Sequence, residues 1–189
     1  MGTEKLLFIY GRLLDPVARR ALCPRARVVC AATLSGFALA FAGHSVEWQG
    51  SLADLRRERG GKCLGVVFRI DAEELDKMDA EDGGIYTRRE FEVVSRNGEA
   101  LIVDAYVQKN PTRGFAPSGK YLNGILLGYK VYELDRRHFL VIMTELLKKS
   151  CRAIGTNNYA PKPTNQDDAE PTNEDGAEPT NEDGAERTI

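Results

Sequence analysis

The sequence is poor in the residues that bind metals or form disulfides. Its 189 residues include four cysteines and two histidines. No two cysteines form a Cys-x-x-Cys pair, and His44 and His138 do not lie at the spacing of metal ligands. We therefore predict no metal site and free thiols, which is typical of proteins from the reducing cytoplasm.

Long apolar runs and basic stripes with interleaved aromatic residues are also lacking. No run of about 18 apolar residues occurs and no secretory signal pattern is found, so we predict no membrane partner and a cytoplasmic location. Lys and Arg are spread along the chain without aromatic residues between them. This distribution predicts no nucleic-acid partner.

The small net charge of −2 is the sum of two regions of opposite charge. From Pro163 the chain reads PTNQDDAE, PTNEDGAE, PTNEDGAE and RTI, with nine acidic residues and one base, Arg187. Residues 1–162 therefore hold 25 Lys and Arg against 19 Asp and Glu, a net charge of +6. The repeat buries too little apolar surface to offset the cost of ordering a backbone, about 1–2 kcal/mol per residue.

We accordingly predict a folded domain over residues 1–155 and a disordered acidic tail over residues 156–189. Three roles of the tail stay open. It is an interaction tail, a repeat that merely solvates the chain, or an electrostatic screen over the basic domain.

The first half of the chain reads mainly as strands. Residues 5–10 (KLLFIY) predict a short buried strand, and Asp15-Pro16 opens a helix over about 16–22. Residues 27–42 predict a strand pair or one bent strand with Gly36 at the bend. Residues 43–60 read as polar and irregular with Trp48 as their apolar anchor, and residues 64–70 (LGVVFRI) predict a further strand.

The second half adds a hairpin and helices. Residues 72–78 predict a short helix capped by Asp71 and Glu74, followed by the turn DAEDGG. Asn97-Gly98 between two apolar-alternating runs, residues 86–94 and 100–109, predicts a β-hairpin.

Residues 118–132 and 136–150 predict two helices, the second with one apolar stripe. Strands do not alternate with long helices along the chain. The predicted fold is therefore α+β, a small mostly antiparallel β-barrel or sheet with flanking helices.

Three segments are candidates for chemistry. The loop Tyr10-Gly11-Arg12-Leu13 passes from a strand to a helix, where unpaired backbone N–H groups suit an anionic group such as a carboxylate. Tyr121, near the start of a predicted helix, is a candidate for lining a pocket beside it.

The third segment is the acidic stretch of residues 79–84. It holds Asp79, Glu81 and Asp82 within four positions, and their mutual repulsion is expected to raise the pKa of at least one carboxyl group. A carboxylate whose pKa lies nearer neutrality suits general acid–base catalysis. A solvated acidic turn is the alternative.

These stretches resemble a known family, and they occur in that family's order. FIYGRL resembles the F-x-Y-G-[ST]-L loop of the γ-glutamylcyclotransferase-like (AIG2-like) proteins. GVVFRIDAEELDKMDAEDGGIYTRREFEVV is similar to the family's G-x-x-[YFW]-x-[ILMV]…L-D-x-x-E-G-x-x-Y-x-R-x-x-V-x-V. APSGKYLNGILLGYKVYEL is similar to the P-S-x-x-Y-x-x-x-I-x-x-G-A helix of its larger members. The resemblance covers about residues 5–150.

The resemblance implies an enzyme that cyclises a small-molecule γ-glutamyl substrate to 5-oxoproline and releases an amine or amino acid, without a metal or organic cofactor. It implies that the amides of Gly11, Arg12 and Leu13 bind the substrate α-carboxylate, in a pocket with Tyr10, Tyr86 and Tyr121. The wall that selects the departing amine is expected to lie partly in residues 43–60. A monomer and a homodimer both stay open.

Two positions depart from the family pattern. The catalytic glutamate of L-D-x-x-E-G falls on Asp82, whose side chain is one methylene shorter, and Glu81 is the alternative carboxylate if the turn is remodelled around Gly83-Gly84. Arg12 replaces a small hydroxyl residue, and is expected to pair with an anionic substrate or with Asp82. A catalytically silent member that serves as a ligand-binding or scaffold domain, an unrelated enzyme and a polyanion-binding module are the alternatives.

Overall fold

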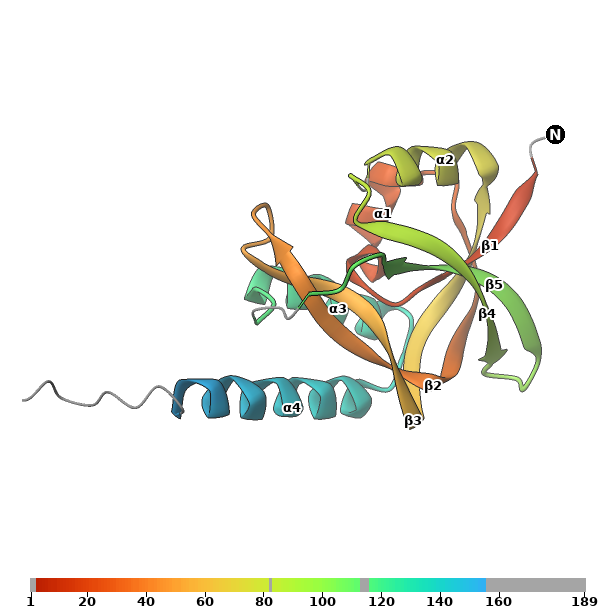
Figure 1. Cartoon of the computed structure of the whole chain (residues 1–189). Helices are drawn as coiled ribbons and strands as arrows, with labels where there is room; N and C mark the ends of the chain where they lie inside the picture. The colour runs from red at the N-terminus through yellow and green to blue at the C-terminus, as the bar shows by residue number, and fades with distance from the viewer. Residues whose placement is uncertain (1–2, 82, 113–115, 156–189) are drawn as a thin grey trace, which may run out of the picture. The chain divides into compact units, whose positions relative to one another are not determined.

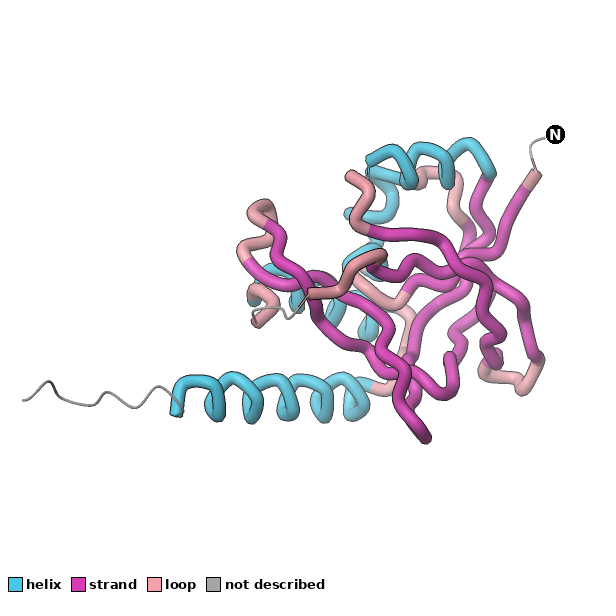
Figure 2. The backbone as a smooth tube through the Cα atoms, viewed as in Figure 1, coloured by secondary structure: helices cyan, strands magenta, loops and turns pink. Residues whose placement is uncertain are grey.

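Five strands form a closed barrel in the order β1-β3-β2-β4-β5. The computed structural model describes residues 3–81, 83–112 and 116–155. Neighbouring strands are antiparallel, except that β1 and β5 meet in parallel where Leu7 pairs with Asp104. The α1 and α2 helices lie together at one end of the barrel, and α3 and α4 lie side by side along another face (Figures 1 and 2). The predicted mostly antiparallel β-barrel with flanking helices is confirmed.

The core of the barrel is built on β1 (Glu4–Ile9) and β3 (Gly50–Asp71). Val66, Val67 and Phe68 of β3 are all fully buried, although successive strand residues point to opposite faces. The outer face is covered as well, since the Arg19 guanidinium of α1 lies 4.4 Å from the centre of the Phe68 ring. Burial on both faces explains the unbroken apolar run in this strand.

A short 3₁₀ helix, η1 (Arg12–Leu14), connects β1 to α1 (Pro16–Leu22). Asp15 caps α1 as predicted, because its carboxylate accepts a hydrogen bond of 2.8 Å from the Val17 N–H. The η1 turn itself was not predicted. It sets the conformation of the chain directly after the Tyr10-Gly11 step.

The β2 strand (Arg27–Ser45) is one bent strand, which was one of the two predicted alternatives. Its register against β3 shifts between Ser35 and Phe37, where Gly36 has a φ of 78°. The prediction that residues 43–60 are irregular is wrong, because β2 continues to Ser45 and β3 starts at Gly50. Hydrogen bonds between the two strands pair the backbone while the charged side chains of residues 56–59 are exposed, so polarity here did not signal a loop.

The α2 helix (Ala72–Glu81) is longer than predicted. Asp79 and Glu81 therefore belong to its last turn, and the predicted acidic turn begins only after Glu81. Gly83 and Gly84 follow with φ values of 63° and 78°, which side chains rarely adopt. The capping role predicted for Glu74 is also wrong: this side chain is buried and accepts a hydrogen bond of 2.9 Å from the Arg25 N–H.

The predicted hairpin is confirmed. It is formed by β4 (Tyr86–Ser95) and β5 (Ala100–Gln108), in which Val94 pairs with Ala100. Gly98 has a φ of 86°, as expected for an Asn-Gly turn.

The α3 helix (Gly119–Val131) approaches η1 very closely. A Cβ atom added at Gly128 would lie 2.2 Å from the Cβ of Leu14, so only glycine allows this contact. The contact holds η1, and with it the preceding loop, against α3.

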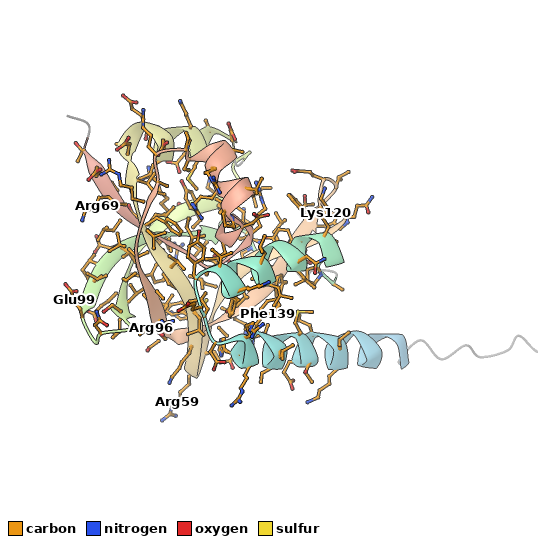
Figure 3. All side chains as sticks on the ribbon, turned by 180° about the vertical axis from the view of Figure 1, so that it is seen from behind. Arg59, Arg69, Arg96, Glu99, Lys120 and Phe139 are labelled. Carbon is orange, nitrogen blue, oxygen red and sulfur yellow. The ribbon has the colours of Figure 1, made fainter. Side chains whose placement is uncertain are left out.

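The α4 helix (Arg136–Gly155) packs on α3 through Phe139, whose ring centre lies 5.1 Å from that of Tyr129 (Figure 3). Its predicted apolar stripe is only partly buried, since the side chains of Leu140 and Leu147 are 59% and 63% exposed. Phe139 meets the domain because it lies near the start of α4, where α3 is adjacent.

The predictions on membrane spans and free cysteines can be compared with the structure only for the described residues. Within the described part of the chain, no helix is long and apolar enough to span a membrane, and Cys23, Cys30 and Cys63 are free. Asp82 and the tail of residues 156–189 lie outside the described residues.

Candidate active site

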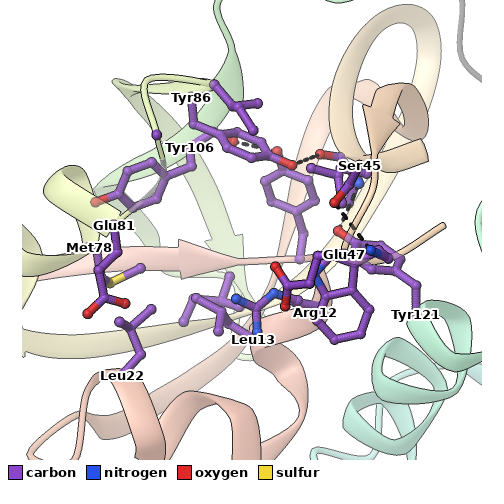
Figure 4. A pocket seen from close by; sticks show the side chains of 18 of the residues that line it. Arg12, Leu13, Leu22, Ser45, Glu47, Met78, Glu81, Tyr86, Tyr106 and Tyr121 are labelled. Carbon is purple, nitrogen blue, oxygen red and sulfur yellow. Dashed lines mark hydrogen bonds between the residues drawn. The ribbon is translucent and has the colours of Figure 1, made fainter. Parts of the chain in front are cut away.

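A cavity of about 300 Å³ opens where the ends of β1, α2, α3 and the β2–β3 turn meet (Figure 4). It is lined by every predicted site residue that the structure describes, which are Tyr10, Gly11, Arg12, Leu13, Glu81, Tyr86 and Tyr121. The glycine loop and the acidic segment are about 70 positions apart in the sequence, and the barrel brings them to one cavity.

A chain of hydrogen bonds fixes three tyrosines around the cavity. The Tyr86 hydroxyl donates to the Ala53 carbonyl at 2.8 Å, and the Ala53 N–H donates to the Tyr121 hydroxyl at 2.9 Å (Figure 4). The Tyr10 hydroxyl donates to the Tyr106 carbonyl. These bonds connect β1, β3, β4, β5 and α3 around one space.

Burial raises the pKa of Tyr10, Tyr86 and Tyr121 above the ordinary tyrosine value. For Tyr121, hydrogen bonds from the backbone of Ala53 and Arg12 partly oppose this effect of burial. The three hydroxyl groups are therefore neutral at physiological pH. They supply hydrogen bonds and add no negative charge that would repel an anionic ligand.

The N–H groups of the glycine loop differ in their partners, and that of Arg12 donates a hydrogen bond to the Tyr121 hydroxyl. The Gly11 carbonyl accepts a 3.0 Å hydrogen bond from the Leu14 N–H, and the Arg12 carbonyl accepts one of 3.0 Å from the Asp15 N–H. Among the described residues, the N–H groups of Gly11 and Leu13 donate no backbone hydrogen bond. A side chain at Gly11 is disfavoured, because its Cβ would lie 3.1 Å from the Cβ of Ala53.

Glu81 is the last residue of α2, and its side chain lines the cavity beside Met78 (Figure 4). Asp79, two residues earlier, is held by its neighbours. Its carboxylate accepts a hydrogen bond of 2.6 Å from the Tyr106 hydroxyl and two, of 3.0 and 2.6 Å, from the Arg88 guanidinium. Asp79 was predicted as one of three repelling acids and matches the Asp of the family's L-D-x-x-E-G, and in the structure it ties the end of α2 to β4 and β5.

The cavity residues that were not predicted individually include Ser45, Glu47, Trp48 and Tyr106. The first three belong to the β2–β3 turn, within or next to the stretch expected to form part of a pocket wall. The Trp48 ring centre lies 5.4 Å from that of Tyr121 and 5.1 Å from the Arg12 guanidinium carbon. The sequence feature that could have indicated these cavity residues was a single tryptophan, Trp48, in a polar stretch.

The composition of the cavity limits its chemistry. No group of three or more His, Cys, Asp or Glu side chains that could hold a metal ion occurs in the described ranges. The cavity offers backbone amides, neutral hydroxyl groups, one guanidinium, and the carboxylates of Glu81 and Glu47. Such a set is suited to binding a small zwitterion and moving protons on it.

Comparisons with known proteins agree with the sequence resemblance. The family model described as Gamma-glutamyl cyclotransferase, AIG2-like matches residues 7–123. The chain is similar to the Gamma-glutamylcyclotransferase of Mus musculus, with 26% identity over 172 residues, covering 87% of this chain and 86% of the relative. It is also similar to that of Homo sapiens, with 26% identity over 168 residues, covering 85% and 84%. A solved structure titled Gamma-glutamyl cyclotransferase superposes with a TM-score of 0.68 at 26% identity, covering 85% of this chain and 93% of that one.

Proposed function

The chain belongs to the gamma-glutamyl cyclotransferase, AIG2-like family, and we propose that it converts a γ-glutamyl amino acid, peptide or amine to 5-oxoproline with release of the amine. The observation that carries the proposal is the shared cavity, in which the Tyr10–Leu13 loop and Glu81 face the same space. The loop motif and Glu81, which precedes the family's catalytic position, therefore line one cavity.

The reaction is intramolecular. The α-amine of the substrate attacks its own γ-carbonyl carbon, a new C–N bond closes the five-membered ring, and the original amide C–N bond breaks. Holding the glutamyl chain in a folded conformation supplies much of the rate acceleration. A cavity of about 300 Å³ whose tyrosine side chains are held by hydrogen bonds suits that task.

The substrate α-carboxylate binds the N–H groups of the glycine loop in this proposal. Gly11 and Leu13 present their amides at the start of η1, and Arg12 adds a positive charge at the same loop. Tyr86, Tyr121 and Tyr10, with neutral hydroxyl groups, line the rest of the cavity.

One carboxylate performs both proton transfers, taking a proton from the substrate ammonium group and returning it to the departing nitrogen. The family motif assigns this role to Asp82, which lies outside the described residues. Glu81 lines the cavity and is the alternative. The choice matters because a shift of about 1 Å in a catalytic group can cost on the order of 100-fold in rate.

The test is release of 5-oxoproline, measured by mass spectrometry, from a panel of γ-glutamyl dipeptides, glutathione and ε-(γ-glutamyl)-lysine. Asp82→Asn is expected to abolish turnover, while Glu81→Gln is expected to retain it. The reverse result would assign the proton transfers to Glu81. Absence of 5-oxoproline from the whole panel would contradict the proposed activity.

A second candidate is a silent member of the family that binds γ-glutamyl ligands without turnover. The observation that favours it is the shorter carboxylate of Asp82 at the position of the family glutamate. It predicts calorimetric binding of a γ-glutamyl dipeptide without product. In that case Asp82→Glu is the informative variant, because gain of turnover would show that the rest of the site is competent.

A further inference from the structure

A second hollow, of about 230 Å³, adjoins the cavity at its α3 side. Arg12, Trp48 and Tyr121 line both spaces, so they form a shared wall. The remaining lining residues come from α1 and α3 and the segment before α1, namely Asp15, Ala18, Lys120, Asn123, Gly124 and Leu127. The proposed function assigns no role to this hollow.

Two cations converge on the one tryptophan of this wall. The Arg12 guanidinium carbon lies 5.1 Å and the Lys120 Nζ 5.4 Å from the Trp48 ring centre, within the range of cation–π contacts. The Trp48 ring packs edge to face on Tyr121, with ring centres 5.4 Å apart. The indole therefore holds both positive charges at the rim of the hollow.

Neither cation is neutralised by a described carboxylate. Among the residues that the structure describes, no Asp or Glu oxygen forms an ion pair within 4.0 Å of Arg12 or Lys120. Asp15 is the acidic residue that lines the hollow, and its Oδ1 already accepts the Val17 N–H at 2.8 Å as a helix cap. The lining of the hollow thus carries two cations and one carboxylate, a net charge of +1, which favours an anionic ligand.

We propose that this hollow binds the carboxylate of the departing amino acid or peptide. The inference rests on the proposed function, because the cavity would then hold the γ-glutamyl part and its amide would lie near the shared wall. A γ-glutamyl amino acid carries a carboxylate two bonds beyond the amide nitrogen, whereas a γ-glutamyl amine carries none. Arg12 and Lys120 form charge-assisted hydrogen bonds with that group, and Asn123 adds a neutral donor at the rim.

The chain consequently prefers γ-glutamyl amino acids and peptides over γ-glutamyl amines. Arg12 stands where the family pattern has a small hydroxyl residue, so its guanidinium is a contribution of this chain to the subsite. Lys120 lies at the start of α3, on the side of that helix away from Phe139 and α4 (Figure 3).

The experiment compares γ-glutamyl-alanine with its C-terminal amide, in which a neutral carboxamide of similar size replaces the charged carboxylate. Steady-state release of 5-oxoproline is measured for the wild-type protein, for Lys120→Met, and for the control Lys130→Met on the same helix. The wild-type kcat/KM is expected to be about 10-fold higher for the acid, in line with a hydrogen bond to a charged group. Lys120→Met lowers kcat/KM about 5- to 10-fold for the acid through KM and leaves the amide unchanged, and Lys130→Met changes neither.

Equal kcat/KM for acid and amide in the wild-type protein would overturn the inference. An equal loss for both compounds in Lys120→Met would overturn it too, since it would indicate a structural role of Lys120. If neither compound gives 5-oxoproline, the proposed function fails separately. Calorimetric binding of the two compounds then tests the subsite by itself. Tighter binding of the acid, lost in Lys120→Met, supports the subsite, whereas equal binding or none contradicts it.

Discussion

The two sides of the cavity are built differently. On the loop side, the Tyr10 and Tyr121 hydroxyl groups form hydrogen bonds with the backbone, the Gly11 carbonyl accepts one from the Leu14 N–H, and Leu14 contacts Gly128. On the helix side, Glu81 is the exposed last residue of α2, and two glycines with positive φ follow. The loop side is therefore buried and packed, whereas the end of α2 is exposed and is held to β4 and β5 through Asp79.

This difference gives the two sides unequal room for change. The loop side is packed against α3, where Gly128 meets Leu14. On the helix side, Gly83 and Gly84 have positive φ values, and a Cβ added at either would have no contact closer than 3.8 Å. Four substitutions or deletions test the contrast, in order of decreasing expected effect.

Gly128→Ala should destabilise the domain most. The new Cβ would lie 2.2 Å from the Cβ of Leu14, so α3 and η1 must separate, at a cost of about 3 kcal/mol in the free energy of unfolding. Urea denaturation followed by circular dichroism measures this loss. Gly124→Ala on the same helix is the control, because its Cβ would have ordinary contacts from 3.8 Å, and alanine there should stabilise the helix by about 0.5–1 kcal/mol. Equal stability of the two variants would contradict the rigid packing of the loop side.

Asp79→Asn should reduce activity more than stability. It weakens the hydrogen bonds from Arg88 and Tyr106 that hold the end of α2, so kcat should fall about 10-fold while KM stays within about two-fold. Steady-state kinetics on the best γ-glutamyl substrate gives both constants. The control is Asp76→Asn, an exposed acid on the same helix, and a matching loss of kcat there would remove the special role of Asp79.

Gly83→Ala should have a moderate effect. Nothing lies within 4 Å of the added Cβ, but a φ of 63° is costly for alanine, about 1 kcal/mol. Gly60, on β3, also has open space and a φ of 73°. Gly60→Ala should therefore lose similar stability and keep full activity, whereas Gly83→Ala should also lower kcat. Loss of kcat in both variants would show that activity follows stability and not the position of the carboxylates.

Deleting residues 163–189 should change least. The repeat holds nine acids and little apolar surface, so the free energy of unfolding should change by less than about 0.5 kcal/mol. Salt-dependent retention on a heparin column tests the screening role. Unchanged retention would favour a repeat that only solvates the chain, and stronger retention after deletion would support an electrostatic screen over the basic domain.

Local sequence signals predicted much of the fold. Asp15-Pro16, Asn97-Gly98 and the apolar run before Gly11 each determine structure through neighbouring residues, and each prediction is confirmed. The predictions failed where contacts between residues far apart in the sequence determine the local structure. Residues 43–60 form strands because β2 and β3 pair with each other, and Glu74 binds Arg25 because α2 lies against the segment after α1.

The sequence by itself determined the family resemblance, the order of the elements, and the candidate residues of the loop and the acidic segment. Only the tertiary structure decided that the loop, Glu81 and the β2–β3 turn line one cavity, and that Arg12 and Lys120 meet at Trp48. The reason is physical. Caps and turns depend on residues a few positions apart, whereas a cavity depends on strand register and helix packing between residues tens of positions apart.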